Sequence, residues 1–142
     1  MLSFDREHEG KERQEFLADC EQRLGEGHHI YTRVENGLLV QHGWLALEQT
    51  EGAFPDVGQT VAYPANTAVI YDLSLDKGPD LARDCLMAMF SDAVKVSERV
   101  AIAVPSENPD LRRIVEAAGF KHAITLFSET RFGTTHEWRE DV

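Results

Sequence analysis

The sequence predicts an α/β (α+β) fold, a single domain whose mixed central sheet is flanked by helices. The first observation is that apolar runs near residues 67–75 and 99–104 are each followed by apolar side chains at helical spacing. Such alternation of strands and helices favours parallel pairing between the strands. The second is the pair Asn36-Gly37 between two β-prone runs, which is typical of a tight hairpin. The third is the length of 142 residues, which suits one hydrophobic core.

The first half of the chain predicts a helix and a hairpin, within one domain of residues 1–142 whose polar residues 1–10 are expected to be flexible. Apolar side chains recur at helical spacing, and glycines then end the helix. Asn-Gly permits a type I′ turn because both central residues must reach positive φ. The expected elements are a helix at Lys11–Leu24, strands at His29–Val34 and Leu38–Leu47, and a loop at Glu48–Val57.

The second half predicts strands that alternate with helices. The run Thr67–Leu75 is nearly continuously apolar, which indicates a central strand covered on both faces. Asn108 is a good helix cap, Pro109 suits the first helical position, and Gly119 ends that helix. The expected elements are strands at Thr60–Tyr63 and Thr67–Leu75, a helix at Leu81–Val94, a strand at Arg99–Val104, a helix from Asn108 to Ala118, and strands at Ala123–Ser128 and Arg131–Trp138.

The chain is acidic, with a formal net charge of −11. This charge disfavours nucleic acid and anionic membrane surfaces as partners, because both carry dense negative charge. It is compatible with a cationic partner such as an amine. A site for a polyanion would need local positive charge or aligned backbone N–H groups. No run of about 18 apolar residues occurs, so we expect no membrane span.

The cysteines and histidines suggest neither a disulfide framework nor a metal centre. Cys20 and Cys85 stand outside any CxxC pair, and two thiols cannot make a framework. We therefore expect a reducing, cytoplasmic setting. His28 and His29 are adjacent, so on a strand they point to opposite faces, and we expect no metal site. The oligomeric state stays open, a homodimer included.

Three stretches of the second half together resemble a known superfamily. Asn108 precedes a helix that ends in Gly119-Phe120, with the glycine 11 residues after the asparagine. An apolar strand at residues 68–76 leads into a strand-to-helix junction. In these features the sequence resembles a divergent GNAT-superfamily N-acetyltransferase, over about residues 38–127. The resemblance implies an acyl-CoA-binding core with acetyl-CoA as cosubstrate, and a small-molecule or peptide amine as acceptor.

The resemblance also implies which positions would contact the cofactor. Strand backbone groups would pair with the pantetheine arm, N–H groups at a helix start would bind the pyrophosphate, and the capping asparagine would orient the cofactor arm. The implied residues are Leu73, Ser74 and Leu75 for pantetheine, Lys77, Gly78, Leu81 and Ala82 for pyrophosphate, and Asn108 for the arm.

The sequence departs from the superfamily pattern at two places. Asp80 occupies an expected glycine and brings negative charge toward the phosphates, while Pro79 removes an N–H donor. An acid in the first turn also suits the helix dipole without any ligand. Val115 stands where many members of the superfamily have a tyrosine that protonates the departing thiolate.

An N-acyltransferase needs a general base for the amine and a proton donor for the thiolate. Asp72 and Glu48 are the candidate bases, and His42 is a third. Asp72 has apolar neighbours, so it is either a buried carboxylate or an exposed residue on the outer face of its strand. Tyr71 and Tyr63 are the candidate proton donors, with packing as the alternative role for each.

Two functions from different classes are compatible with these residues. The leading hypothesis is an acyl-CoA-dependent N-acyltransferase that transfers an acetyl group directly to an unidentified amine. The rival, which Asp80 and Val115 favour, is a catalytically degenerate GNAT-like binding or accessory module, in one version linked to polysaccharide synthesis. No motif identifies the acceptor.

Overall fold

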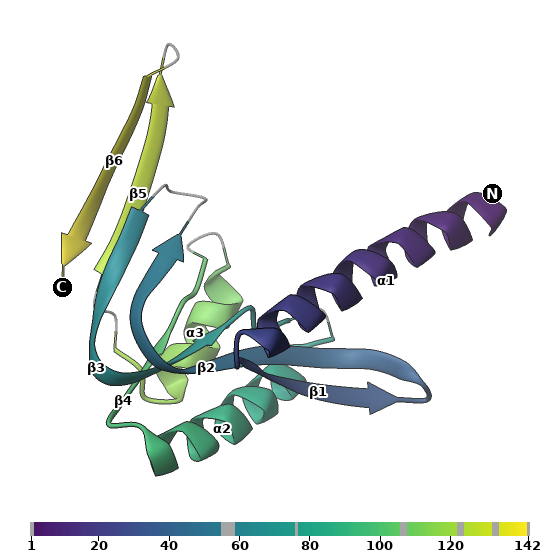
Figure 1. The fold of residues 1–142 in the computed structure, drawn as a ribbon, viewed down its shortest axis with the longest axis horizontal. Helices are drawn as coiled ribbons and strands as arrows, with labels where there is room; N and C mark the ends of the chain where they lie inside the picture. Colours follow the sequence, from purple (N-terminus) through teal and green to yellow (C-terminus); the bar gives the residue numbers. More distant parts are fainter. Residues whose placement is uncertain are drawn as a thin grey trace.

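The computed structural model describes residues 2–54, 59–75, 77–105, 108–121, 124–131 and 134–141. Figure 1 shows how the helices and strands are arranged. In chain order the elements are α1 (Leu2–Gly25), β1 (His29–Glu35), β2 (Leu38–Phe54), β3 (Gln59–Tyr71), α2 (Pro79–Val96), β4 (Arg99–Ile102), α3 (Pro109–Ala117), β5 (Ile124–Arg131) and β6 (Thr134–Asp141).

Within the described residues, four strands form a mixed sheet in the order β1-β2-β3-β4. The pairs β1–β2 and β2–β3 are antiparallel, whereas β3 and β4 are parallel and are connected through α2. Strands β5 and β6 form a separate antiparallel hairpin that extends away from the sheet (Figure 1). The predicted mixed sheet flanked by helices is therefore confirmed.

The hairpin between β1 and β2 forms as the sequence predicts. Asn36 and Gly37 have φ values of 52° and 76°, which are the positive values that a type I′ turn requires. Glu35 pairs with Leu38 across the turn. The local Asn-Gly signal was sufficient here because the turn depends on two backbone conformations and on no distant contact.

Several element boundaries differ from the sequence prediction, among them the end of β4, which is Ile102 rather than Val104. Strand β2 continues to Phe54, so the loop predicted at Glu48–Val57 is wrong as far as that residue, and residues 55–57 lie outside the described part of the chain. Helix α1 begins at Leu2 rather than at Lys11. Strand β3 is continuous from Gln59, where two shorter strands were expected.

Pro64 does not break β3 because it lies in an interruption of the ladder. Ala62 pairs with Glu51, and the next paired residues are Thr67 and Gln49. The missing N–H of the proline therefore costs no ladder hydrogen bond, as is usual for proline at bulges.

Strand β3 ends at Tyr71, before the predicted end at Leu75. Asp72 has a φ of 49°, and this left-handed conformation turns the chain out of the extended path. The predicted strand also included Asp76, which lies outside the described residues. Residues 72–75 thus connect β3 to α2 as non-helical backbone beside the sheet.

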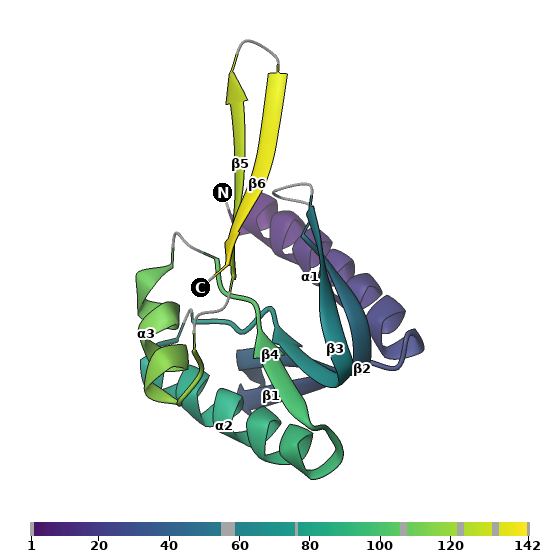
Figure 2. The same cartoon turned by 90° about the vertical axis from the view of Figure 1, so that its left-hand side faces the viewer.

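The hydrophobic core lies between the sheet and the pair of helices α2 and α3, which lie next to each other in Figure 2. Apolar side chains from both layers meet there and are excluded from water. The buried members are Leu45, Ala68, Ile70 and Leu73 from β2, β3 and the segment after it, Leu86, Met89 and Ala93 from α2, and Leu111 and Val115 from α3.

Gly43 allows α2 to pack directly on the backbone of β2. A Cβ atom at this position would lie 2.6 Å from Met89 Cε, 3.1 Å from Leu73 Cδ1 and 3.2 Å from Cys85 Sγ. A side chain there would have to displace the terminal methyl group of Met89 and crowd Leu73 and Cys85. The glycine is therefore explained by close packing rather than by backbone conformation.

Helix α1 lies on the opposite side of the β1–β2 hairpin from α2 (Figure 1). Its Phe16 ring meets the His42 ring edge-on, with centroids 5.5 Å apart. Its Cys20 is buried, and its Arg23 lies over Trp44. Among the described helices, none is both long and apolar enough to cross a membrane.

Candidate functional site

The parallel strands β3 and β4 stop pairing at one point. Their register runs from Thr67 with Arg99 to Ile70 with Ile102, and Ala103 N–H then donates to the Ile70 carbonyl at 3.2 Å. After Tyr71 the left-handed Asp72 redirects the chain. The segment that follows is bonded to β2, so the two parallel strands separate here.

Ser74 fixes that segment to β2 through three groups. Its N–H donates to the His42 carbonyl at 2.9 Å, its Oγ accepts from His42 N–H at 3.0 Å, and its carbonyl accepts from Gln41 Nε2 at 2.7 Å. Along an extended chain, adjacent residues point their backbone groups to opposite edges. Leu73 and Leu75 therefore direct theirs away from β2, but the Leu75 carbonyl accepts from Gly78 N–H at 3.2 Å, so Ser74 and Leu75 are both engaged within the protein.

The residues implied for pyrophosphate binding lie at the start of α2, where some features favour an anion and others oppose it. Gly78 is the N-cap with a φ of 106° and makes no side-chain cap, and Pro79 takes the first helical position. The amides of the first turn lack helical partners by geometry, so the N–H groups of Asp80 and Leu81 are available donors. Lys77 is exposed beside them, whereas Ala82 is buried against the sheet.

Asp80 is less repulsive than the sequence alone indicates. Its Oδ1 accepts a hydrogen bond from Arg83 Nη2 at 2.8 Å, in an exposed pair one helical turn apart. The guanidinium group offsets the charge that was expected to oppose phosphate. Arg83 is a cation that the sequence analysis missed, although its place directly after Ala82 was a signal that could have found it.

Asn108 caps α3, as predicted. Its Oδ1 accepts a hydrogen bond from Leu111 N–H at 3.1 Å. This contact explains the residue without a cofactor, so the implied role in orienting the cofactor arm stays a prediction. Val115, on the same helix, is buried in the core and offers no proton donor.

Tyr71 is the last residue of β3, at the point where β3 and β4 separate. Its Oη shares a hydrogen bond of 2.5 Å with His28 Nδ1. Burial raises the pKa of Tyr71 to about 12, although the Arg23 charge opposes part of this rise. The phenol therefore keeps its proton at neutral pH and can donate it.

Arg23 brings α1 into this region. Its Nη1 donates to Asp72 Oδ2 at 2.7 Å, and its Nη2 donates to Asp19 Oδ2 at 2.8 Å. The guanidinium carbon lies 5.0 Å from the centroid of the Trp44 ring and 5.2 Å from that of Tyr71, within the range of cation–π attraction. Burial lowers the pKa of Arg23, but its bond and attraction to Asp72 outweigh this and raise it.

The rings of Trp44 and Tyr71, which lie beneath Arg23, are called the Trp44–Tyr71 platform. Trp44 and Tyr71 are paired neighbours on β2 and β3, and their rings stack with centroids 6.3 Å apart and an interplanar angle of 23°. Trp44 is only 1% exposed. This cluster was not predicted from the sequence, because only the Asp19–Arg23 spacing is local and the remaining contacts depend on the fold.

The candidate bases do not converge. Asp72 is exposed, with 54% of its side chain accessible, and lies beside the Trp44–Tyr71 platform. Glu48 is exposed in a bulge of β2, at a φ of 54°. Because Trp44 pairs with Tyr71, Glu48 lies four residues further along β2, or about 13 Å away at the usual strand rise.

The two remaining candidates have structural contacts. His42 packs against Phe16 and bonds Ser74 through its backbone. Tyr63 lies against Gly52, far along β3 from Tyr71, and burial raises its pKa. Within the described residues, no group of three or more His, Cys, Asp or Glu side chains is arranged to hold a metal ion.

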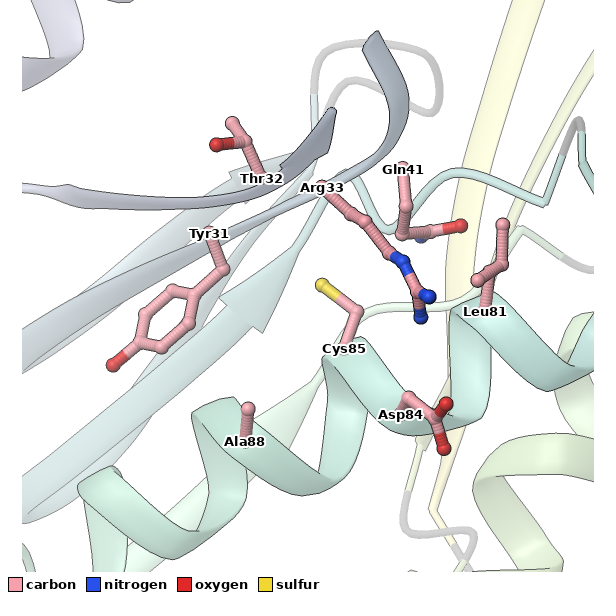
Figure 3. Close-up of a pocket in the computed structure, with 8 residues that line it drawn as sticks. All are labelled: Tyr31, Thr32, Arg33, Gln41, Leu81, Asp84, Cys85 and Ala88. Atoms are coloured by element: carbon pink, nitrogen blue, oxygen red, sulfur yellow. The ribbon is translucent and has the colours of Figure 1, made fainter. Parts of the chain in front are cut away.

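A cavity of about 240 Å³ lies between the β1–β2 hairpin and α2 (Figure 3). Its lining includes Gln41, whose side chain is buried and whose Oε1 has no partner among the described residues. Burial raises the pKa of the neighbouring Cys85 thiol to about 11, and a hydrogen bond with Gln41 opposes part of that rise. This cavity is on the α2 side of the sheet, away from Arg23.

A second cavity, of about 400 Å³, lies between α2 and α3. Apolar side chains form most of its lining, and two arginines, Arg83 and Arg113, stand at it. Each arginine pairs with the acid three residues before it, Asp80 and Asp110 respectively. Neither this cavity nor the first includes Tyr71 in its lining.

Comparison with known proteins supports the fold and goes no further. The structure is similar to a crystal structure of a probable acetyltransferase, with a TM-score of 0.54 and 15% identity over 79% of this chain and 70% of that one. It is also similar to an inferred acetyltransferase from Agrobacterium tumefaciens str. C58, with a TM-score of 0.56 and 18% identity over 80% and 76%. These similarities confirm the predicted fold class, a mixed sheet flanked by helices as in these acetyltransferase structures.

A third solved structure that matches the chain is that of a transcriptional regulator from Bacillus halodurans C-125, with a TM-score of 0.48 and 15% identity over 66% of this chain and 59% of that one. No protein-family model matches the sequence, and no curated protein matches it.

Proposed function

We propose that the chain is an acyl-CoA-dependent N-acyltransferase that uses acetyl-CoA and acts on an amine. The observation that carries the proposal is the separation of β3 from β4 directly before a segment in which the Leu73 backbone groups and the Leu75 N–H point away from β2. The start of α2 follows this segment immediately. Strand backbone for an amide-containing arm and helix N–H groups for a pyrophosphate are thus adjacent in one chain path.

The residues present fit the cofactor in part. Lys77 and the first-turn N–H groups of α2 supply local positive character, and the Arg83–Asp80 pair lowers the repulsion expected from the acid. The net charge of −11 and the absent N–H of Pro79 oppose phosphate binding. We therefore expect weak to moderate affinity that falls as salt screens the lysine.

Acyl transfer needs one bond to form and one to break. Acetyl-CoA supplies an activated thioester, and the amine nitrogen forms a bond to its carbonyl carbon as the carbon–sulfur bond breaks. Tyr71 is the proposed proton donor to the sulfur, because its phenol stays protonated at neutral pH and lies where β3 and β4 separate. Asp72 is the proposed base for the amine proton, once Arg23 releases its carboxylate.

Calorimetric titration with acetyl-CoA and free CoA at moderate salt tests the proposal. Saturable binding below about millimolar cofactor is expected, since weaker affinity would leave the site empty at ordinary cofactor levels. Absence of heat at millimolar acetyl-CoA would overturn the assignment of an acyltransferase.

A matched pair of variants tests the placement of the pyrophosphate. Asp80→Gly removes an acid from the start of α2 and frees Arg83, so it should tighten binding of acetyl-CoA. Asp110→Gly is the control, because it removes the equivalent acid paired with Arg113 at the start of α3. Equal affinities for the two variants would refute the assignment of the loop before α2.

The rival function is a binding module without catalysis, and two observations favour it. Val115 is a core residue, and Arg23 bonds the carboxylate that would act as base. If acetyl-CoA binds but no free thiol is released with a panel of primary amines, the module is the better description.

A further inference from the structure

The strongest unexplained feature outside the cofactor path is the environment of Arg23. We propose that Trp44, Tyr71 and Asp72 form a binding site for the guanidinium or ammonium group of a ligand, and that Arg23 of the same chain occupies this site as an internal competitor. The binding site stands by itself, whereas its use in acyl transfer rests on the proposed function.

The site has the chemistry that selects a cation. The stacked rings of Trp44 and Tyr71 carry the negative potential of their π systems, and Arg23 lies within cation–π range of both. Asp72 adds a carboxylate at the edge of the platform, in reach of Arg23 Nη1 at 2.7 Å. A planar cation thus finds two ring faces and a charge-assisted hydrogen bond in one place. Arg23 demonstrates that a guanidinium group fits.

The platform is fixed, and its occupant comes from a less firmly attached element. Trp44 and Tyr71 are a paired position of two sheet strands. Helix α1 ends at Gly25, and Gly27 follows with a φ of 88°, and open space surrounds both glycines where a side chain would be. The connection is closed by hydrogen bonds from Gly27 N–H to the Leu24 carbonyl and from His28 N–H to the Arg23 carbonyl, each at 3.0 Å, so a change in the angle of the helix would have to open this cap.

The packing of α1 is also light. Leu17 and Leu24, two of its larger apolar side chains, are each more than half exposed. In Figure 1 the N-terminal part of α1 extends beyond the sheet. Arg23 itself keeps 22% of its side chain accessible, so solvent reaches the site without unfolding. Asp19 is on α1 and would leave together with Arg23.

The platform lies beside the proposed acyl-transfer site, so its occupation by Arg23 would affect that site. Asp72 follows the last residue of β3, directly beside the point at which β3 and β4 separate. A cation held on the platform would place a nitrogen next to the Tyr71 hydroxyl. While Arg23 is bound, the same carboxylate and ring faces are covered. Helix α1 would then act as an inhibitory element that a cationic ligand must displace.

A titration with simple cations tests the proposal and requires no acyl-CoA. Trp44 emission is isolated by Trp138→Phe, which removes the other tryptophan. Propylguanidinium and butylammonium chloride are titrated into this parent protein and into its Arg23→Ala variant. We expect the variant to bind at least about tenfold more tightly, equivalent to about 1.4 kcal/mol, because the internal competitor is gone.

Two further variants keep the result interpretable. Arg13→Ala removes an exposed arginine from the same helix and should leave cation affinity at the level of the parent. Arg23→Ala combined with Asp72→Asn should lose the gain, because the carboxylate is part of the site. Circular dichroism and the thermal midpoint establish that each variant is folded. If Arg23→Ala does not fold, Arg23→Gln carries the same comparison.

Two outcomes overturn the proposal: equal affinity in the parent and in folded Arg23→Ala or Arg23→Gln, or a gain that persists when Asp72 is replaced. The test is separate from that of the proposed function. If cations bind as expected but acetyl-CoA does not, the cation site is retained and the acyltransferase proposal is rejected. If acetyl-CoA binds but Arg23→Ala gains no affinity for cations, the acyltransferase proposal is retained and the cation site is rejected.

Discussion

The two faces of the β1–β2–β3 sheet are built from different kinds of side chain. The face toward α2 and α3 is apolar and closed, with Leu86 and Met89 fully buried. The face toward α1 carries an arginine, two stacked rings and an exposed carboxylate. The face toward α2 and α3 thus forms the hydrophobic core. The face toward α1 has the composition of a cation-binding surface, which Arg23 of α1 covers.

The face toward α2 and α3 mainly stabilises the fold, whereas the face toward α1 provides the proposed binding site. Apolar burial contributes in proportion to area and needs no particular partner. A buried or half-buried charge is tolerated only where specific partners compensate for lost hydration. Changes on the α2 face should therefore lower stability strongly, while changes on the α1 face should alter binding more than stability.

The largest effect is expected for Leu86→Ala. Leu86 is fully buried beneath the sheet, so its truncation removes packing and leaves a cavity, which should lower the free energy of unfolding by about 2–5 kcal/mol. Met87→Ala is the control, because Met87 is adjacent on the helix and 45% exposed. Urea unfolding followed by circular dichroism measures both. Similar losses for the two variants would contradict the placement of the core.

A smaller effect is expected at the start of α3. Asn108→Ala removes the acceptor for Leu111 N–H and should cost about 1 kcal/mol of unfolding free energy. Asn108→Asp retains an oxygen acceptor and should keep most of the stability. If both variants lose the same amount in urea unfolding, the cap is not the reason for the asparagine. This helix belongs to the core face, so no change in cation affinity is expected.

The sequence predicted those features that depend on a few neighbouring residues. The Asn36-Gly37 turn and the Asn108 cap are local, and both are found as expected. The end of β3 was placed too late, because the left-handed conformation of Asp72 follows from its surroundings rather than from its residue type. The strand alternation was enough to give the fold class.

The candidate site was less predictable. Asp72 and Tyr71 were identified from their strand, but their partner Arg23 is 49 residues away from Asp72 in sequence. The contact depends on how α1 lies on the sheet, which no spacing encodes. Glu48, at the end of the hairpin, was predicted as a candidate base together with Asp72, yet the register of β2 on β3 separates them. Residue types near a site are thus visible in the sequence, while their mutual positions depend on the register.

A still smaller loss of stability is expected for Asp72→Asn on the binding face. Asparagine tolerates the left-handed conformation at this position, so the variant removes charge with little backbone strain. The Asp72 carboxylate is half exposed, and such ion pairs contribute only about 0.2–1 kcal/mol. Glu35→Gln, which breaks the exposed Arg33 pair at the hairpin, is the control. A loss above about 2 kcal/mol in urea unfolding would show that Arg23 is a structural clasp, against the displaceable occupant proposed above.

Two tyrosines, one on each face, give a prediction for alkaline pH. Tyr31 faces α2, where it donates to Asp92 at 2.7 Å, and Tyr71 faces α1; burial raises the pKa of each to about 12, from 10.0. Because the folded state holds these protons more tightly, their stabilisation is complete below pH 10 and is lost as pH rises toward 12. Tyr31→Phe and Tyr71→Phe should each flatten the fall in stability over that range.

The comparison of the two tyrosines then distinguishes the two faces. Arg23 lies over the Tyr71 ring and opposes the rise in its pKa, whereas Asp92 adds to the rise for Tyr31. Removal of the guanidinium group by Arg23→Ala should therefore raise the pKa of Tyr71 further and leave Tyr31 unchanged. Absorbance at the tyrosinate wavelength, compared between each protein and its phenylalanine variant, measures this difference. An equal change at both tyrosines would mean that Arg23 acts through global stability, and the platform would lose its separate electrostatic character.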